Sequence, residues 1–123
     1  MTYLFIAVGG MLGALARFGL GTWIGQRWNN AYPLGTFLIN ITGAFVLGFI
    51  NVYFLERTVV SPALRLGIGV GFLGAYTTFS TFTYEAMRLI EDGSYMLALG
   101  YVSASAVIGL IAVYLGMTLG RNL

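Results

Sequence analysis

The sequence predicts an all-α membrane protein with four transmembrane helices per chain and a break near the middle of the third helix. Of its 123 residues, 59% are hydrophobic and only 8% are charged, whereas about 25% of the residues in a soluble domain are charged. The apolar residues gather in four long runs, and the third run also carries a dense cluster of hydroxyl groups. We expect a single transmembrane domain over residues 1–123, with no soluble domain beside it.

Each run is long enough to span a bilayer, since about 20 mostly apolar residues cross ~30 Å of hydrocarbon. The predicted spans are 3–24, 34–55, 64–87 and 95–119. Short polar segments separate them, and tryptophan and tyrosine near their ends suit the membrane interface. No lysine or arginine precedes the first apolar run, so we expect a membrane helix there and not a cleaved signal peptide.

The arginines predict insertion in both orientations. Orientation normally follows an excess of lysine and arginine on one side, but here each side would hold three arginines: Arg57, Arg65 and Arg121 against Arg17, Arg27 and Arg88. We therefore predict an antiparallel, dual-topology homodimer. The alternative is that another insertion signal selects one orientation. A second copy would also cover polar groups that four helices alone leave toward lipid.

Composition excludes several functions. The absence of cysteine and histidine removes disulfides, thiol catalysis, Cys/His metal sites and imidazole acid–base chemistry. A net charge of +2 is too sparse for binding nucleic acid through its phosphates. The G-x-G-x-x-G match at residues 69–74 lacks the strand–helix context of a dinucleotide site. Glycines four residues apart favour close helix packing and occur at Gly9/Gly13, Gly21/Gly25, Gly67/Gly71 and Gly116/Gly120.

The middle of the third span, Gly74-Ala75-Tyr76-Thr77, predicts the helix break because glycine and β-branched residues are poor helix formers. A break frees carbonyl groups, which are tolerated at membrane depth only where something satisfies them. In an antiparallel dimer the two-fold axis passes through the bilayer centre, so both chains can bring carbonyls together. Converging carbonyls bind cations such as Na⁺, and we expect a structural monovalent ion because the site requires no buried carboxylate.

Beyond the break, Phe79, Phe82 and Glu85 recur on one helical face, flanked by hydroxyl groups. Phenyl edges are electropositive, and ring edges that alternate with hydroxyl and amide donors could replace the water around a small anion. The alternative is that these phenylalanines serve ordinary packing.

Three further polar features lie inside the predicted spans. Arg17 could attract anions or simply extend toward water. Asn40 could donate hydrogen bonds to a ligand or clasp another helix. Tyr101 and Ser105 share a face of the fourth span, although such serines often bond to their own helix backbone.

Three segments resemble a known family: GGMLGALARF, GTFLINITGAFVLG and GFLGAYTTFSTFTYE. They closely resemble the Fluc (CrcB) family of bacterial fluoride channels, and the resemblance covers essentially the whole chain. It implies an antiparallel dimer with two fluoride pores and a central Na⁺ at the dimer interface. It also implies that the carbonyls of Gly74 and Thr77 bind this Na⁺, that Phe79 and Phe82 line the pores, and that Asn40 is the amide donor of the pore.

The resemblance assigns the remaining polar residues as well. It places Arg17 in an electropositive vestibule and assigns the polar face beside the phenylalanines to Thr78, Ser80, Thr81 and Glu85. Tyr101 and Ser105 match a hydroxyl track in the fourth span, but Gly109 lacks the hydroxyl that some members carry next, which leaves the length of the track open.

The resulting expectation is a passive fluoride channel of the cell inner membrane that exports F⁻ and limits its toxicity, with fluoride, a second copy and lipid as its partners. Such a channel performs no chemistry, so we predict that the chain is not an enzyme. One alternative is a small proton-coupled exporter, for which the only acid inside a span is Glu85. The other is a non-transporting membrane assembly protein.

Overall fold

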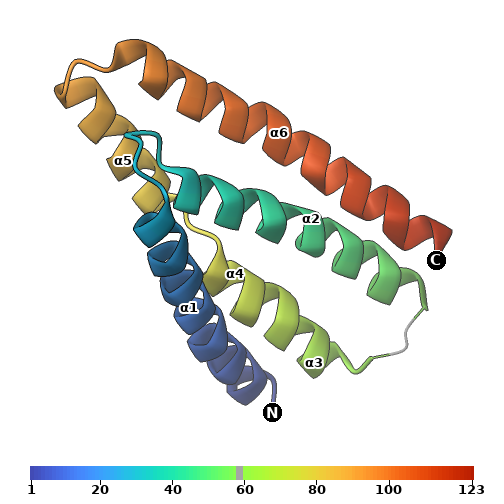
Figure 1. The fold of residues 1–123 in the computed structure, drawn as a ribbon. Coiled ribbons are helices and arrows are strands. Elements are labelled where there is room, and N and C mark those ends of the chain that lie inside the picture. Colours follow the sequence, from blue (N-terminus) through green and yellow to red (C-terminus); the bar gives the residue numbers. More distant parts are fainter. Residues whose placement is uncertain (58–59) are drawn as a thin grey trace.

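The computed structural model describes residues 1–57 and 60–123, and these residues fold into helices joined by short segments (Figure 1). Three helices are long: α1 (Thr2–Arg27), α2 (Leu34–Arg57) and α6 (Tyr95–Asn122). The third predicted span is divided into α3 (Pro62–Leu66), the π-helix η1 (Gly67–Leu73), α4 (Gly74–Tyr76) and α5 (Ser80–Glu91).

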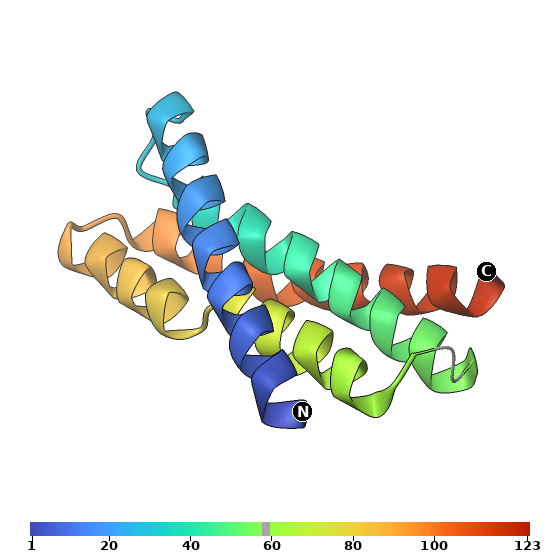
Figure 2. The same cartoon turned by 90° about the horizontal axis from the view of Figure 1, so that it is seen from below.

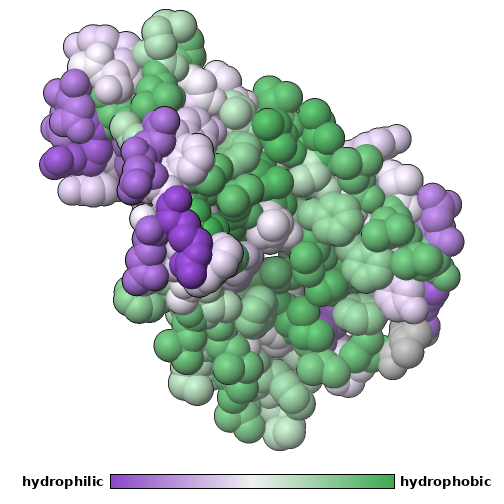
Figure 3. All heavy atoms as spheres, viewed as in Figure 1, coloured by the Kyte–Doolittle hydropathy of each residue, from purple (hydrophilic) through white to green (hydrophobic). Residues whose placement is uncertain are grey.

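The three long helices are apolar enough and long enough to cross a membrane. Their side chains make most of the surface visible in Figure 3 hydrophobic, and hydrophilic residues gather at its upper left and right edges. Lipid can cover such a surface, whereas in water it would form a much larger exposed apolar patch than soluble proteins carry. The chain is therefore a multi-pass membrane protein, as predicted.

The helices pair off in two groups. In Figures 1 and 2, α1 runs beside the continuous stretch α3–η1–α4, and α2 runs beside α6. Both termini lie at the end where α2 finishes and α3 begins, and α5 continues to the opposite end, where it turns into α6. This arrangement places the break between α4 and α5 inside the molecule, next to α2 and the middle of α1.

Glycines allow the close contact within each pair. A Cβ at Gly9 would overlap the carbonyl oxygen of Gly67, and a Cβ at Gly116 would overlap that of Phe45. Backbone can approach this closely only where the side chain is missing. Of the predicted glycine pairs, Gly21/Gly25 does not make such a contact, since no atom of the described residues lies within 4 Å of the position that a Cβ at Gly25 would take.

The break lies slightly beyond the predicted position. Helical structure continues through Tyr76, because the N–H of Thr77 still donates to the carbonyl of Leu73 at 3.0 Å. The backbone then becomes extended at Thr77 (φ −83°, ψ 160°), and α5 begins at Ser80. The non-helical residues are thus Thr77, Thr78 and Phe79, and not the Gly74–Thr77 segment that propensity alone indicates.

A small core forms where α5 meets α6. Its centre is Tyr101, which is 0% exposed, and its other buried members are Ala86, Leu89 and Ala98. Partly buried side chains surround it, among them Tyr32 and Phe82. This core fixes the half of the third span that follows the break against the start of the fourth.

Candidate functional site

The break between α4 and α5 is built by side chains that take over backbone hydrogen bonds. In a continuous helix, the N–H of Thr78 would donate to Gly74 and the N–H of Thr81 to Thr77. Here the Thr78 N–H donates to Oδ1 of Asn40 at 2.9 Å, and the Thr81 N–H donates to the hydroxyl of Thr78 at 3.2 Å. The carbonyls of Gly74 and Thr77 thereby lose their helical donors.

Asn40 holds the break from α2. Besides accepting from the Thr78 N–H, its Nδ2 donates to the Thr78 carbonyl at 3.0 Å, so one side-chain amide pairs with both backbone groups of one residue. Of the two alternatives for this asparagine, the structure shows the interhelical clasp. One N–H of the amide remains for another acceptor, since the group has two.

Arg17 holds the break from α1. Its Nε donates to the carbonyl of Ala75 at 3.0 Å, a bond between α1 and α4 that the sequence did not predict. The side chain therefore points into the protein, and Arg17 lines a cavity. A guanidinium has five N–H donors, so this bond leaves several that can face an anion.

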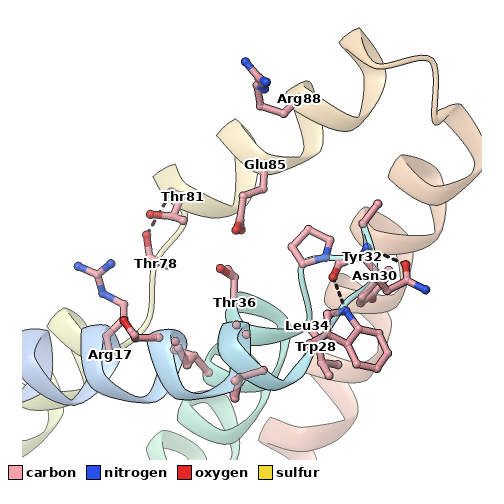
Figure 4. Close-up of a pocket in the computed structure, with 18 of the residues that line it drawn as sticks. Arg17, Trp28, Asn30, Tyr32, Leu34, Thr36, Thr78, Thr81, Glu85 and Arg88 are labelled. Carbon is pink, nitrogen blue, oxygen red and sulfur yellow. Dashed lines mark hydrogen bonds between the residues drawn. The ribbon is translucent and has the colours of Figure 1, made fainter.

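That cavity, which we call the vestibule, has a volume of about 740 Å³. Its polar lining includes Arg17, Thr36, Thr78, Thr81 and Glu85. Figure 4 shows Glu85 and Thr36 pointing toward one another across it, while Trp28 and Tyr32 lie at its rim. Helix α5 contributes Thr81 and Glu85 one turn apart, so one face of this helix forms a wall.

The carboxylate of Glu85 accepts a hydrogen bond from the hydroxyl of Tyr101 at 3.1 Å. Tyr101 itself lies behind the vestibule in the core, with its ring in edge contact with those of Tyr32 (centroids 5.3 Å apart) and Phe82 (5.0 Å). At the rim, desolvation by burial raises the pKa of Tyr32 above 10.0. The aromatic cluster thus fixes both a carboxylate of the vestibule and a phenylalanine of the next cavity.

A second cavity, the lateral pocket, has a volume of about 500 Å³ and shares Thr78 with the vestibule as a lining residue. It brings together Gly74 and Thr77 of the break with Phe79, Phe82, Asn40 and Ser105. Phe79 and Phe82 have ring centroids 6.1 Å apart, and the side chain of Phe79 is 77% exposed. The pocket is therefore open on the side of Phe79, where this chain provides no wall.

Ser105 supplies an unpaired polar group to the lateral pocket. Its hydroxyl oxygen is buried but has no hydrogen-bond partner among the residues that the structure describes. It therefore does not make the bond to its own helix backbone that is common for serines in membrane helices. A buried hydroxyl without a partner is costly, and its O–H is available to a ligand in the lateral pocket that Ser105 lines.

The structure divides the predicted site residues between the two cavities. Thr78 borders both cavities. Glu85 lines the vestibule, whereas Phe79 and Phe82 line the lateral pocket. Tyr101 lines neither cavity and packs in the core against Phe82. Ser80 lies in neither cavity; it is exposed at the start of α5, where its carbonyl accepts from the Thr83 hydroxyl at 3.0 Å. Gly109 also borders neither, which agrees with the doubt about the hydroxyl track beyond Ser105.

The sequence reasoning left several vestibule residues unidentified, among them Thr36 and Tyr32. Thr36 lies one helical turn before Asn40 on the same face of α2, and this spacing could have indicated it. Tyr32 lies in the short connection before α2, where it looked like an interfacial anchor, and only its contact with Tyr101 shows its place beside the site.

These residues match a known protein family. A family described as CrcB-like protein, Camphor Resistance (CrcB), matches residues 4–117, which include both cavities and the break. The chain belongs to the CrcB family. The family resemblance that the three sequence segments indicated is thereby confirmed.

Relatives in the CrcB family match along nearly all of this chain and most of their own length. The fluoride-specific ion channel FluC of Acidobacterium capsulatum is 46% identical over 123 residues, which cover 100% of this chain and 98% of the relative. The protein of the same name from Geotalea uraniireducens is 45% identical over 99% of this chain and 98% of its own. Fluoride-specific ion channel FluC 1 of Moorella thermoacetica is 46% identical over 98% of this chain and 86% of its own length.

The names of these CrcB relatives describe ion channels, in agreement with the prediction that the chain is not an enzyme. Together with the apolar helices, they also agree with the predicted multi-pass location in the cell inner membrane.

Proposed function

We propose that this chain is a passive fluoride-selective channel that exports F⁻ and so reduces fluoride toxicity. The observation that carries the proposal is the full-length match to relatives named fluoride-specific ion channels, 46% identical over 123 residues. The geometry supports it, because the vestibule and the lateral pocket meet at Thr78 and together offer a route lined by donors.

Fluoride would enter the vestibule, where the free N–H groups of Arg17 favour an anion. It would then pass Thr78 and Thr81 toward the lateral pocket, where the spare N–H of Asn40, the hydroxyl of Ser105 and the edges of Phe79 and Phe82 replace its water. A narrow route of this kind favours the smaller ion, since chloride is excluded by size and gains less from each donor.

The functional unit in this proposal is an antiparallel homodimer with two pores. The open side of the lateral pocket at Phe79 supports a second copy as the missing wall. The balanced arginines support opposite orientations of the two copies. An apolar wall contributed by a partner would also shield Ser105 and Asn40 from lipid.

The proposal includes a structural Na⁺ at the dimer interface. The carbonyls of Gly74 and Thr77 fit such an ion, because both have lost their helical donors and both residues border the same pocket. Carbonyl oxygens without a carboxylate suit a monovalent cation. When bound, the ion would supply a fixed positive charge that holds carbonyls of the two copies together.

The test is fluoride efflux from liposomes that contain the purified protein, followed with a fluoride-selective electrode and compared with chloride efflux. We expect rapid release of F⁻, little release of Cl⁻ and no dependence on a proton gradient. Release that requires a proton gradient would replace this proposal with a coupled exporter that uses Glu85. The absence of any release would favour a non-transporting assembly protein.

A further inference from the structure

The two hydrogen bonds between Asn40 and Thr78 close a ring that resembles a pair of bonds between strands. The amide of Asn40 accepts from the Thr78 N–H at 2.9 Å and donates to the Thr78 carbonyl at 3.0 Å. Both partners are only partly exposed, and the bonds cross from α2 to the break. This ring constrains the backbone on both sides of Thr78.

The ring also sets the direction of a carbonyl that it does not touch. A peptide unit is planar and trans, so the carbonyl of one residue points opposite to the N–H of the next. The Thr77 carbonyl and the Thr78 N–H belong to one such plane. Because the Thr78 N–H points at Oδ1 of Asn40, the Thr77 carbonyl must point away from Asn40.

The neighbouring contacts of α2 hold the same short segment. A Cβ at Gly43, about one turn beyond Asn40, would overlap the methyl carbon of Thr77, so this glycine lets α2 lie directly on the break. The hydroxyls of Thr42 and Tyr76 lie 3.0 Å apart and form a further hydrogen bond to α4. These contacts hold α2 against the break beside Asn40, and the two bonds to Thr78 fix the orientation of the Asn40 amide.

We infer that Asn40 is a positioning residue for the cation site as well as a donor in the pore. Through the plane it shares with Thr78, it orients the Thr77 carbonyl toward the cation, and through the Thr78–Phe79 peptide it fixes the start of the anion route. This inference rests on the proposed Na⁺ site. It predicts that one substitution in α2 weakens Na⁺ binding although the side chain is not itself a ligand.

The test measures how the thermal unfolding temperature of the full-length protein in detergent rises with Na⁺, with N-methylglucamine holding the ionic strength constant. A ligand that binds only the folded protein raises its free energy of unfolding by RT ln(1 + [L]/Kd), so the unfolding temperature begins to rise where [Na⁺] approaches Kd and then climbs with log [Na⁺]. Fitting this curve gives the Kd for Na⁺. A general loss of stability lowers the whole curve and leaves the fitted Kd unchanged.

Two substitutions separate the roles. Asn40→Leu has a similar size but loses both bonds, and we expect it to raise the fitted Kd for Na⁺ by about 10- to 100-fold, as is typical when a residue that orients a metal ligand is removed. Asn40→Asp keeps an acceptor for the Thr78 N–H, and we expect no rise. Ser103→Ala is the matched control, since this serine is exposed on α6 and lines neither cavity. If Asn40→Leu unfolds without a cooperative transition, Asn40→Ala takes its place with the same expectation.

Each outcome has one interpretation. A raised Kd for Na⁺ in Asn40→Leu, with an unchanged Kd in Asn40→Asp and Ser103→Ala, supports the inference. An unchanged Kd in Asn40→Leu overturns it and leaves the proposed Na⁺ site intact, with Asn40 acting in the pore alone. If the unsubstituted protein does not respond to Na⁺, the cation site and the inference fall together, while fluoride efflux by that protein still tests the channel function separately.

Discussion

Replacing Gly13 by alanine should disturb both the packing of the third span and the contact of Arg17. Gly13 lies where α1 touches η1, and a Cβ at this position would overlap the carbonyl oxygen of Phe72 and lie 2.9 Å from its carbonyl carbon. Since the atoms it meets are backbone, no change of rotamer relieves the contact. The two helices must move apart.

The expected cost has two parts. Overpacking a close contact of this kind costs about 1–3 kcal/mol. Arg17 lies one turn further along the same face of α1, so separation would also stretch its 3.0 Å bond to Ala75, which contributes about 1–2 kcal/mol at membrane depth. We therefore expect the free energy of unfolding to fall by about 2–5 kcal/mol relative to a neutral glycine-to-alanine change.

Gly19→Ala is the matched control. It lies on the same helix, and nothing among the described residues comes within 4 Å of its Cβ position. Both substitutions gain about the same helix propensity, roughly 1 kcal/mol, so this term cancels in the comparison. The assay is reversible unfolding in mixed micelles with increasing SDS, together with fluoride efflux. Equal unfolding free energies for the two variants, within about 0.5 kcal/mol, would refute the reasoning.

Three further predictions concern the aromatic cluster. Phe82→Ile removes the ring edge that borders the lateral pocket and should abolish fluoride efflux while crosslinking still detects dimers; efflux at the unsubstituted rate would contradict the role. Tyr101→Phe removes the hydroxyl that bonds to Glu85 and should lower the unfolding free energy by about 0.5–1.5 kcal/mol, whereas Tyr114→Phe, at a 64% exposed site on the same helix, should leave it unchanged. Burial raises the pKa of Tyr32 above 10.0, so the neutral phenol stabilises the folded state below pH 10, and this contribution is lost as the pH rises above that value. The thermal unfolding temperature of Tyr32→Phe should therefore fall less at alkaline pH than that of the unsubstituted protein. Identical pH profiles for the two proteins would count against this role.

Hydropathy and local propensity predicted most of the fold, because each depends on residues close together in the chain. Four apolar runs of about the right length predicted the spans, and the glycine and threonines of the third run predicted its break within about three residues. The predicted position of the break was imprecise because helix propensity does not say which backbone N–H groups donate to a side chain instead of to the helix, as those of Thr78 and Thr81 do. The π-helix η1 was not predicted, since its glycines are equally typical of close packing between ordinary α-helices.

What the sequence by itself determined is the class of protein, its spans, its polar residues within them and its family, because these follow from composition, period and motif. What only the tertiary structure decided is how those polar residues pair. The bonds from Asn40 to Thr78 and from Arg17 to Ala75 join residues 38 and 58 positions apart, and periodicity places a residue on a helix face without saying which face lies opposite. The same limit explains why one face of α5 could be recognised as polar and aromatic, yet its division between the vestibule and the lateral pocket became visible only once α1, α2 and α6 were packed around it.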